Sequence, residues 1–344
     1  MNIIIALILF SVIIMFHEWG HFLLARLNGI RVNEFSLGLG PTIVGFTRNE
    51  TKFSIKLLPF GGACIMEGED GESTDSRSFN AKTPLQRISV VAAGPVFNFI
   101  MAFVFSVILI GCHGYLEPVV YDVMEGYAAE EAGIEAGDRI VAINNKHISF
   151  YDEISAYTAF HTGEELDITY ERGGVRTTVT VTPKYDEETG RYLIGLYGSG
   201  EYTKTGILGA LRYGAAEVKY YIWYTVSSLK MLVSGQVGLN DMSGVVGIVD
   251  TVSDVVEESA QYGIYYVFLN LLNIGILLAA DLGVMNLLPI PALDGGRLVF
   301  LVIELIRGKP VRPEREGMVH FIGLVCLFGL MILIMANDIR KLFL

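Results

Sequence analysis

The sequence predicts an α-helical polytopic membrane protein with about four transmembrane helices. Of the 344 residues, 52% are hydrophobic and the mean hydropathy is +0.47, values too high for an ordinary soluble protein of this length. The apolar residues are also gathered into four long runs, each close to the ~20 residues that cross a hydrocarbon core. A third observation is an acidic stretch between the second and third runs, which predicts a domain outside the membrane. The four runs cover residues 3–24, 88–110, 265–288 and 318–335.

The first apolar run contains the pattern H-E-W-G-H at residues 17–21. Because residues four apart share one face of a helix, His17 and His21 can offer two imidazole nitrogens to one Zn²⁺, while Glu18 leans toward the open coordination position. A charged or strongly polar side chain at the centre of a bilayer costs about 2.5 to 3.5 kcal/mol, so three of them in five residues favour a bound metal. The alternative is a structural pair of buried histidines, which would need a hydrogen-bond partner for every ring nitrogen and for the carboxylate. The pattern therefore predicts the metal site of a metalloprotease.

Asp294 is the best candidate for the third protein ligand that a catalytic zinc usually has besides water. It lies directly after the third run, in the sequence N-L-L-P-I-P-A-L-D-G-G of residues 286–296. The two prolines must end the helix, and irregular backbone at this depth needs a cavity lined by protein or water. The alternative is that the span simply ends here and that Asp294 lies in interfacial water.

The Lys and Arg residues near the runs predict the orientation in the membrane. Residues 31–87 carry seven of them and residues 297–315 carry five, so both segments are expected on the cytoplasmic side and both termini outside. Residues 113–204 contain 7 basic and 17 acidic residues, which accounts for most of the net charge of −12 and fits a translocated domain. This acidity argues against a nucleic acid as partner.

Several motifs in order resemble those of the site-two protease family, in particular its bacterial RseP-type intramembrane zinc metalloproteases. Besides residues 17–21 and 286–296, they are A-G-P-V-F-N-F at residues 93–99 and S-G-V-V-G-I at residues 243–248. The resemblance covers nearly the whole chain. It implies that His17, His21 and Asp294 bind zinc and that Glu18 is the general base. It also implies that Asn98 and Asn286 help to hold the substrate strand or the intermediate.

The segment 52–66 is apolar, favours β structure and contains Gly61-Gly62, so a hairpin near the membrane is expected. The resemblance implies a membrane-dipping β-element whose free edge pairs with an unwound substrate helix. Residues 117–183 resemble a PDZ domain, which either binds extended peptides by β-augmentation or acts as a steric filter against untrimmed substrates. Residues 205–235 are too polar for another span and fit an amphipathic helix. Its aromatic residues lie either at the outer membrane surface or against the PDZ-like domain.

These features divide the chain into four predicted segments, which add a β-hairpin and a PDZ-like domain to the predicted transmembrane helices. Residues 1–112 are the first two transmembrane helices with the HEXXH motif and a membrane-associated β-hairpin. Residues 113–200 are one extracytoplasmic PDZ-like α+β domain. Residues 201–262 are an extracytoplasmic amphipathic helical segment, and residues 263–344 are the last two transmembrane helices with the LDG motif.

The predicted function is that of an intramembrane zinc metalloendopeptidase, with Zn²⁺ as cofactor, that cleaves single-span proteins within or near their transmembrane helix. By resemblance, it acts in regulated intramembrane proteolysis in a bacterial cell membrane, with the active site toward the cytoplasmic side. Anti-sigma factors or signal-peptide remnants are the expected substrates. One alternative is a non-catalytic membrane adaptor whose PDZ-like domain binds partners. Another is a transporter that binds its substrate at the broken third span, although four spans without an evident repeat make it a poor candidate.

Overall fold

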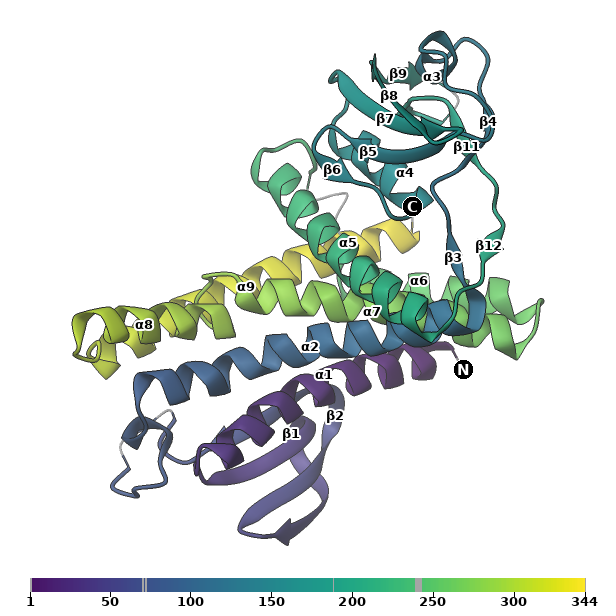
Figure 1. Cartoon of the computed structure of the whole chain (residues 1–344). Helices are drawn as coiled ribbons and strands as arrows, with labels where there is room; N and C mark the ends of the chain where they lie inside the picture. Colours follow the sequence, from purple (N-terminus) through teal and green to yellow (C-terminus); the bar gives the residue numbers. More distant parts are fainter. Residues whose placement is uncertain (1, 70, 72, 188, 239–242, 344) are drawn as a thin grey trace. The chain divides into compact units, whose positions relative to one another are not determined.

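The structure is a computed structural model that describes residues 2–69, 71, 73–187, 189–238 and 243–343 (Figure 1). The chain divides into two compact units. The helical unit comprises Met1–Phe105 and Val237–Leu344, and the β-rich unit comprises Ser106–Gln236. The predicted segment 201–262 contributes one helix to each unit, and its residues 239–242 lie outside the described residues.

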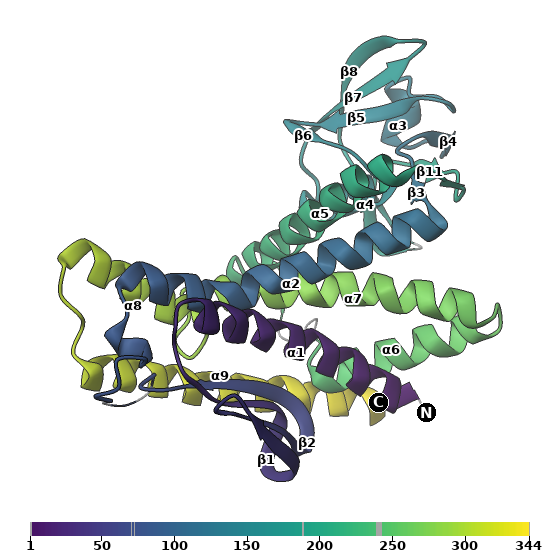
Figure 2. The same cartoon turned by 60° about the horizontal axis from the view of Figure 1, so that its bottom comes forward.

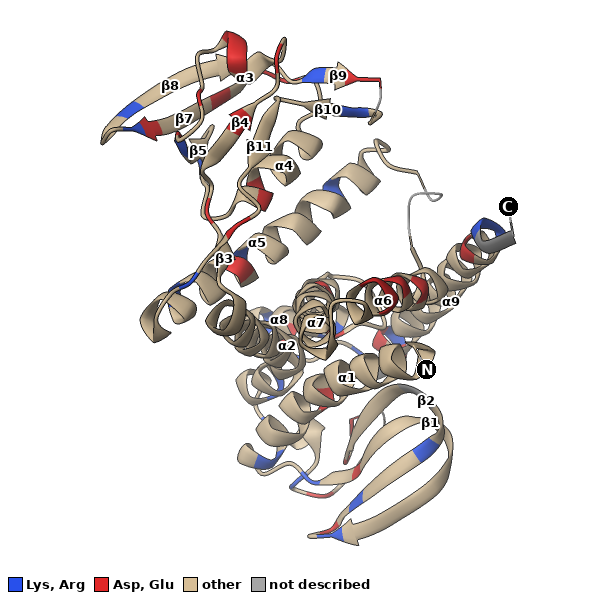
Figure 3. Cartoon of the chain, turned by 90° about the vertical axis from the view of Figure 1, so that its right-hand side faces the viewer, with Lys and Arg blue, Asp and Glu red and all other residues tan. Residues whose placement is uncertain are grey.

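The helical unit is built on long apolar helices (Figure 2). Within the described residues, four helices are long and apolar enough to cross a membrane: α1, α2, α7 and Glu314–Lys341 of α9. They match the four apolar runs, which confirms the prediction of a polytopic membrane protein. The ribbon of α1 carries few charged residues (Figure 3), and Asp281 is the one charged residue in the sequence of α7. The helices are α1 (Asn2–Leu27), α2 (Pro84–His113, which continues into the β-rich unit), α6 (Val245–Ala260), α7 (Ile264–Leu287), α8 (Asp294–Arg307) and α9 (Pro313–Phe343), with a short 3₁₀ turn at Phe79–Ala81.

A long hairpin of β1 (Val32–Arg48) and β2 (Thr51–Met66) follows α1. Its two turn residues, Asn49 and Glu50, both have positive φ, as a two-residue turn matching the twist of the strands requires. The strands bend back on themselves, because residues 34–37 pair both with residues 52–55 and with residues 62–65. Residues 62–66 therefore form an outer strand of this small sheet, and among the described residues they pair only with residues 32–37.

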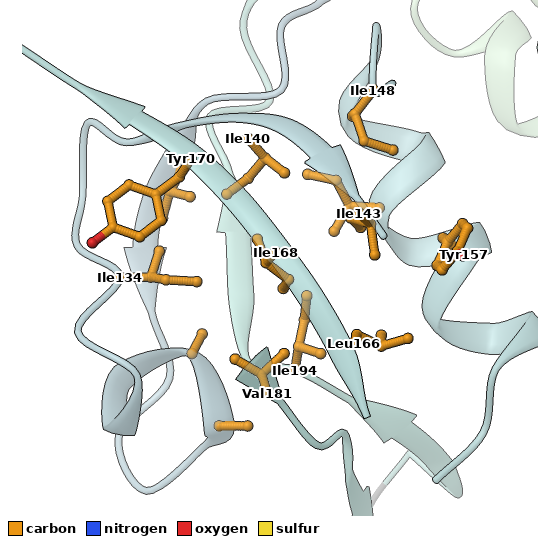
Figure 4. Packing of buried hydrophobic residues seen from close by; sticks show 14 residues of the cluster. Ile134, Ile140, Ile143, Ile148, Tyr157, Leu166, Ile168, Tyr170, Val181 and Ile194 are labelled. Carbon is orange, nitrogen blue, oxygen red and sulfur yellow. The ribbon is translucent and has the colours of Figure 1, made fainter. Parts of the chain in front are cut away.

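The β-rich unit has a four-stranded sheet in the order β6-β5-β7-β8 and three smaller two-stranded ladders. Its core is a cluster of branched aliphatic and aromatic side chains that includes Ile140, Ile143 and Ile168 (Figure 4). The strands are β3 (Tyr115–Leu116), β4 (Val120–Val123), β5 (Arg139–Ile143), β6 (Lys146–His147), β7 (Leu166–Arg172), β8 (Val175–Val181), β9 (Lys184–Asp186), β10 (Arg191–Leu193), β11 (Leu196–Gly198) and β12 (Tyr202–Thr203), and the helices are α3 (Ala128–Glu131), α4 (Tyr151–Phe160) and α5 (Ile207–Val233).

The helix α5 packs on α4 through aromatic side chains. The Trp223 ring stacks on Tyr157 with 5.8 Å between ring centroids, and Phe160 meets the same indole edge-on at 5.3 Å. The ammonium of Lys146 lies 3.7 Å from the centre of the Trp223 ring, which adds a cation–π contact. Of the two expected positions for this aromatic cluster, the structure shows Trp223 packed against the folded domain.

Candidate metal centre

Two histidines and one carboxylate from opposite ends of the chain converge in the helical unit. His17 and His21 lie on one face of α1, both buried, with 3.2 Å between their Nε2 atoms. Asp294 is the first residue of α8, and its Oδ2 lies 3.2 Å from Nε2 of His17 and 3.4 Å from Nε2 of His21. In the part of the chain that the structure describes, this is the one group of three side chains arranged to hold a metal ion.

The backbone between α7 and α8 turns Asp294 toward the histidines. The helix α7 ends at Leu287, two residues before Pro289, whose ring and missing N–H are incompatible with a continuing helix. The new helix starts very close to this turn. A Cβ at Gly295 would lie 2.1 Å from the carbonyl oxygen of Leu288, and one at Gly296 would lie 2.5 Å from that of Ile290. Only glycine fits at these positions, and the tight turn places the carboxylate on the side of α1.

Glycines also bring α1 and α2 into close contact at the site. A Cβ at Gly20 of α1 would lie 2.5 Å from the carbonyl oxygen of Ala93 on α2. A Cβ at Gly94 would lie 2.3 Å from Nε2 of His21 and 2.6 Å from Cε1 of His17. The backbone of α2 at Gly94 therefore forms one wall of the space in which the two imidazoles and Asp294 meet.

The outer ring nitrogens of both histidines have partners on α2. Nδ1 of His21 lies 2.9 Å from the carbonyl oxygen of Val90, an acceptor, so Nδ1–H donates and Nε2 keeps its lone pair for a metal. Nδ1 of His17 lies 3.0 Å from the side-chain nitrogen of Asn98. Asn98 has no exposed surface, and its Oδ1 has no hydrogen-bond partner in the part of the chain that is described. The predicted residue Asn98 is thus brought to the site, beside His17.

The three converging atoms fit a zinc ion. Tetrahedral zinc with bonds of 2.0–2.1 Å separates its ligand atoms by about 3.3 Å, and the three atoms here are 3.2 to 3.4 Å apart. Oδ2 of Asp294 is buried and accepts no hydrogen bond from any described residue, which is costly for a carboxylate unless a cation is its partner. Two neutral imidazoles and one carboxylate also match the donor set of catalytic zinc sites.

Glu18, which follows the first histidine, lies beside the outer strand of the hairpin. A Cβ at Gly62 would lie 2.9 Å from Cγ of Glu18 and 3.2 Å from the side chain of Ile14. The backbone of β2 therefore runs directly past the carboxylate-bearing residue of the motif. Asn286, the other predicted residue, is half-buried in the last turn of α7, eight residues before Asp294.

Sequence reasoning did not single out Gly94 or Val90 as parts of this site. Gly94 could have been predicted, because it lies in the A-G-P-V-F-N-F motif and a glycine in a helix interior often marks a close approach of another group. Val90 was not, since it contributes only a backbone carbonyl, for which the residue type carries no signal.

A candidate metal site formed by the HEXXH histidines and a distant aspartate, among helices apolar enough to cross a membrane, is the arrangement expected of a membrane-embedded metalloprotease. The chain belongs to peptidase family M50, whose family model matches residues 5–330. It is therefore a zinc metalloprotease of the site-two protease type, as the sequence resemblance predicted.

Relatives of similar sequence extend over the whole chain. A Clostridium acetobutylicum protein, which its name assigns provisionally to the zinc metalloproteases, is 39% identical over 98% of this chain and 97% of its own. The zinc metalloprotease RasP of Geobacillus kaustophilus is 34% identical over 100% of this chain and 99% of its own. The regulator of sigma-W protease RasP of Bacillus subtilis is 33% identical over the same shares of the two chains.

The alignments with the two RasP proteins span 424 and 427 residues, against 344 residues in this chain, so these relatives are longer. Among solved structures, the PDZ domain of the SdrC-like protein of Listeria innocua matches 25% of this chain and 97% of its own at 24% identity. Its TM-score of 0.23 is too low to establish a shared fold.

Proposed function

We propose that this protein hydrolyses peptide bonds within or beside the transmembrane segments of single-span membrane proteins, with His17, His21 and Asp294 as zinc ligands and Glu18 as general base. The observation that carries the proposal is the meeting of three ligand atoms within 3.4 Å of one another, next to Glu18 and among apolar helices. A site among helices that are apolar enough to cross a membrane favours a substrate segment that also lies in the membrane.

Glu18 performs the proton transfers in this mechanism. Zinc, when bound, lowers the pKa of a water ligand to about 7 and polarises the scissile carbonyl. The Glu18 carboxylate accepts a proton from the attacking water as the new C–O bond forms. It then delivers that proton to the amide nitrogen as the C–N bond breaks, so that a carboxylic acid and an amine leave. Hydrogen bonds from Asn286, and from Asn98 as the resemblance implies, are proposed to hold the substrate or the intermediate.

The outer strand of the hairpin is proposed to present the substrate. An amide inside an α-helix is hydrogen-bonded and shielded, so the substrate must unwind before hydrolysis. Residues 62–66 pair with residues 32–37, and Gly62 lies against Glu18. A substrate strand added along β2 would receive main-chain hydrogen bonds there and pass the general base. We therefore propose that residues 62–66 of β2 are the part of the hairpin that binds the substrate.

The β-rich unit is proposed to be an extracytoplasmic PDZ-like domain that selects substrates. It contains a cavity of about 780 Å³ between α4 and the strands β10 and β11. The cavity favours binding of an extended apolar segment, and a steric filter against bulky outer domains is the alternative. Lining residues include Met124, Ile154, Ser155, Tyr192, Leu193 and Leu196.

The cellular setting is proposed from the charge distribution and the relatives. The seven Lys and Arg residues of 31–87 and the five of 297–315 favour a multi-pass protein of the bacterial cytoplasmic membrane with the active site toward the cytoplasm and both termini outside. One relative is named a regulator of sigma-W protease. Membrane-anchored anti-sigma factors, or signal-peptide remnants, are accordingly proposed as substrates.

The first experiment measures zinc content and cleavage of a single-span reporter by the purified full-length protein. Glu18→Gln is expected to keep zinc and lose cleavage, whereas Asp294→Ala loses both. Glu187→Gln, an exposed acidic residue of the β-rich unit, is the matched control and should behave as the parent. Zinc without cleavage in the parent itself would instead favour the adaptor function, and ordinary turnover by Glu18→Gln would remove Glu18 as the base.

A further inference from the structure

The turn before Asp294 uses a side chain from the last helix to complete its hydrogen bonds. Residues 289 and 291 are prolines and have no N–H. The N–H of Ile290 donates to the carbonyl oxygen of Leu288 at 2.7 Å, and that of Leu293 donates to Ile290 at 3.2 Å. The remaining N–H of the turn, that of Ala292, donates to Nδ1 of His320 on α9 at 2.9 Å.

The backbone of this turn is strained at Ala292. Its φ of +76° lies in the left-handed region, which disfavours any residue with a Cβ. A strained residue persists only where surrounding contacts hold it. The hydrogen bond to His320 is a contact of that kind, and it acts two residues before the carboxylate of Asp294.

The same face of α9 contacts the turn a second time and also touches α8. A Cβ at Gly323, three residues after His320, would lie 2.4 Å from Cβ of Pro291 and 2.7 Å from its carbonyl oxygen. The ring of His320 packs against Phe300 of α8 with 5.5 Å between centroids, and its side chain is only 17% exposed. The α9 face thus braces both the turn before Asp294 and the helix that Asp294 begins.

We propose that His320 is a positioning residue, which holds the Asp294 carboxylate at the metal by accepting the amide hydrogen of Ala292. The inference rests on the proposed role of Asp294 as a zinc ligand. Because the Ala292 N–H can only donate, Nδ1 of His320 is the acceptor, and the neutral ring carries its hydrogen on Nε2. Without this bond the turn can relax toward negative φ and carry the carboxylate away from the two imidazoles.

Two substitutions that differ in reach test the hydrogen bond. In His320→Asn the side-chain oxygen is attached to Cγ, as Nδ1 is in histidine, so the acceptor is preserved. In His320→Gln the oxygen is one bond further out and overshoots the Ala292 N–H. Zinc affinity is measured on the purified full-length protein by competition with a chelating indicator, and the absorption of the Co²⁺-substituted protein reports the ligand geometry. Phe321→Leu, a neighbour whose side chain is exposed on α9, is the control.

Loss of a group that orients a metal ligand typically lowers metal affinity 10- to 100-fold. We expect a loss of roughly this size in His320→Gln, with an altered Co²⁺ spectrum, and affinity within a few-fold of the parent in His320→Asn and Phe321→Leu. Equal affinities in the two His320 variants, both retained or both lost, would overturn the proposal. If neither His320 variant accumulates, Gly323→Ala and Gly329→Ala replace them. Gly323→Ala should lose zinc affinity, whereas Gly329→Ala should keep it, because a Cβ there meets no described atom within 4 Å. Equal zinc affinities in these two variants would also overturn the proposal.

Zinc binding and cleavage by the parent protein distinguish failure of this inference from failure of the proposed function. A parent that neither binds zinc nor cleaves removes the proposed function, and the inference falls with it. A parent that binds and cleaves, with His320→Gln binding as tightly, removes only the role of His320.

Discussion

At the scale of single residues, the proposed metal centre depends on two glycines that have no side chain as much as on the three proposed ligands. The two imidazoles fit only because Gly94 presents bare backbone to them, and α1 reaches α2 only because Gly20 has no side chain. Their outer nitrogens are then turned by Val90 and Asn98, which leaves Nε2 of each ring directed at Asp294. Space and orientation are therefore set by the same short stretch of α2.

Gly94→Ala is expected to weaken zinc binding without unfolding the protein. Its Cβ would lie 2.3 Å from Nε2 of His21, so the ring must leave its position. Overpacking of this kind costs about 1–3 kcal/mol, which corresponds to roughly 5- to 150-fold weaker zinc binding. Gly111→Ala in the same helix is the matched control, because a Cβ there meets nothing within 4 Å. Chelator competition on both variants makes the measurement, and equal zinc affinities would contradict the close approach at Gly94.

The Asn98 amide is expected to present its oxygen to His17 once zinc is bound. Zinc on Nε2 requires a hydrogen on Nδ1 of His17, and only Oδ1 of Asn98 can accept it; turning the amide by 180° exchanges the two atoms. Asn98→Asp keeps an acceptor at this place and should retain zinc, whereas Asn98→Leu should lose roughly 10- to 100-fold in affinity. If Asn98 acts on the substrate alone, both variants will bind zinc as the parent does and lose only kcat/KM.

At the scale of elements, α5 shows how a helix too polar for the membrane is anchored. Its aromatic residue Trp223 packs on α4, while Oε2 of Glu217 is buried and has no hydrogen-bond partner among the described residues. Burial raises the pKa of Glu217 to about 7, and the negative charge of Asp152 adds to the shift. The folded state therefore favours the protonated form of this carboxyl.

The stability of the β-rich unit is expected to fall as the pH rises from about 4.5 to about 7, because Glu217 binds its proton more tightly in the folded state than in the unfolded chain. The full shift corresponds to at most about 3 kcal/mol above pH 7. Glu217→Gln removes this loss and should raise the melting temperature of the full chain at pH 8 but not at pH 4. Glu201→Gln, which changes an exposed acidic residue of the same unit, is the control. A parent and a Glu217→Gln variant with parallel pH profiles would show that the buried carboxyl does not titrate in this range.

At the scale of the whole molecule, basic and acidic residues are concentrated in different segments of the chain. Basic residues gather in the segments 31–87 and 297–315 beside the apolar helices, and acidic residues dominate residues 113–204. Since basic loops are retained on the cytoplasmic side, this pattern favours opposite sides of the membrane for the α8–α9 connection and the β-rich unit.

Labelling of single cysteines with a membrane-impermeant maleimide tests this orientation. In a background in which Cys64, Cys112 and Cys326 are replaced by alanine, Glu187→Cys should react in intact cells. Lys309→Cys, in the connection between α8 and α9, should react only after the membrane is opened. Labelling of Lys309→Cys in intact cells would reverse the proposed topology.

How much the sequence determined differs between the parts of the site. His17 and His21 could be predicted because helical pitch alone brings residues four apart together, and both histidines stand out in an apolar run. Asp294 could be singled out by its cost in a broken span, yet it remained equally consistent with a span end. The four long apolar helices followed from length and hydropathy, and a folded domain between the second and third of them followed from its acidity and its resemblance to PDZ domains.

Only the tertiary structure decided which distant groups meet. Three contacts depend on how separate helices pack: Asp294 lies 3.2 Å from His17, Gly94 forms the wall behind the rings, and the N–H of Ala292 donates to His320. Helix packing is set by many weak contacts summed over whole surfaces, and several of the groups involved are backbone atoms that every residue carries. Local sequence patterns predict the secondary structure of a segment and the chemistry of its side chains. The contacts of a backbone carbonyl, a glycine or a single histidine with distant residues form only when the chain folds.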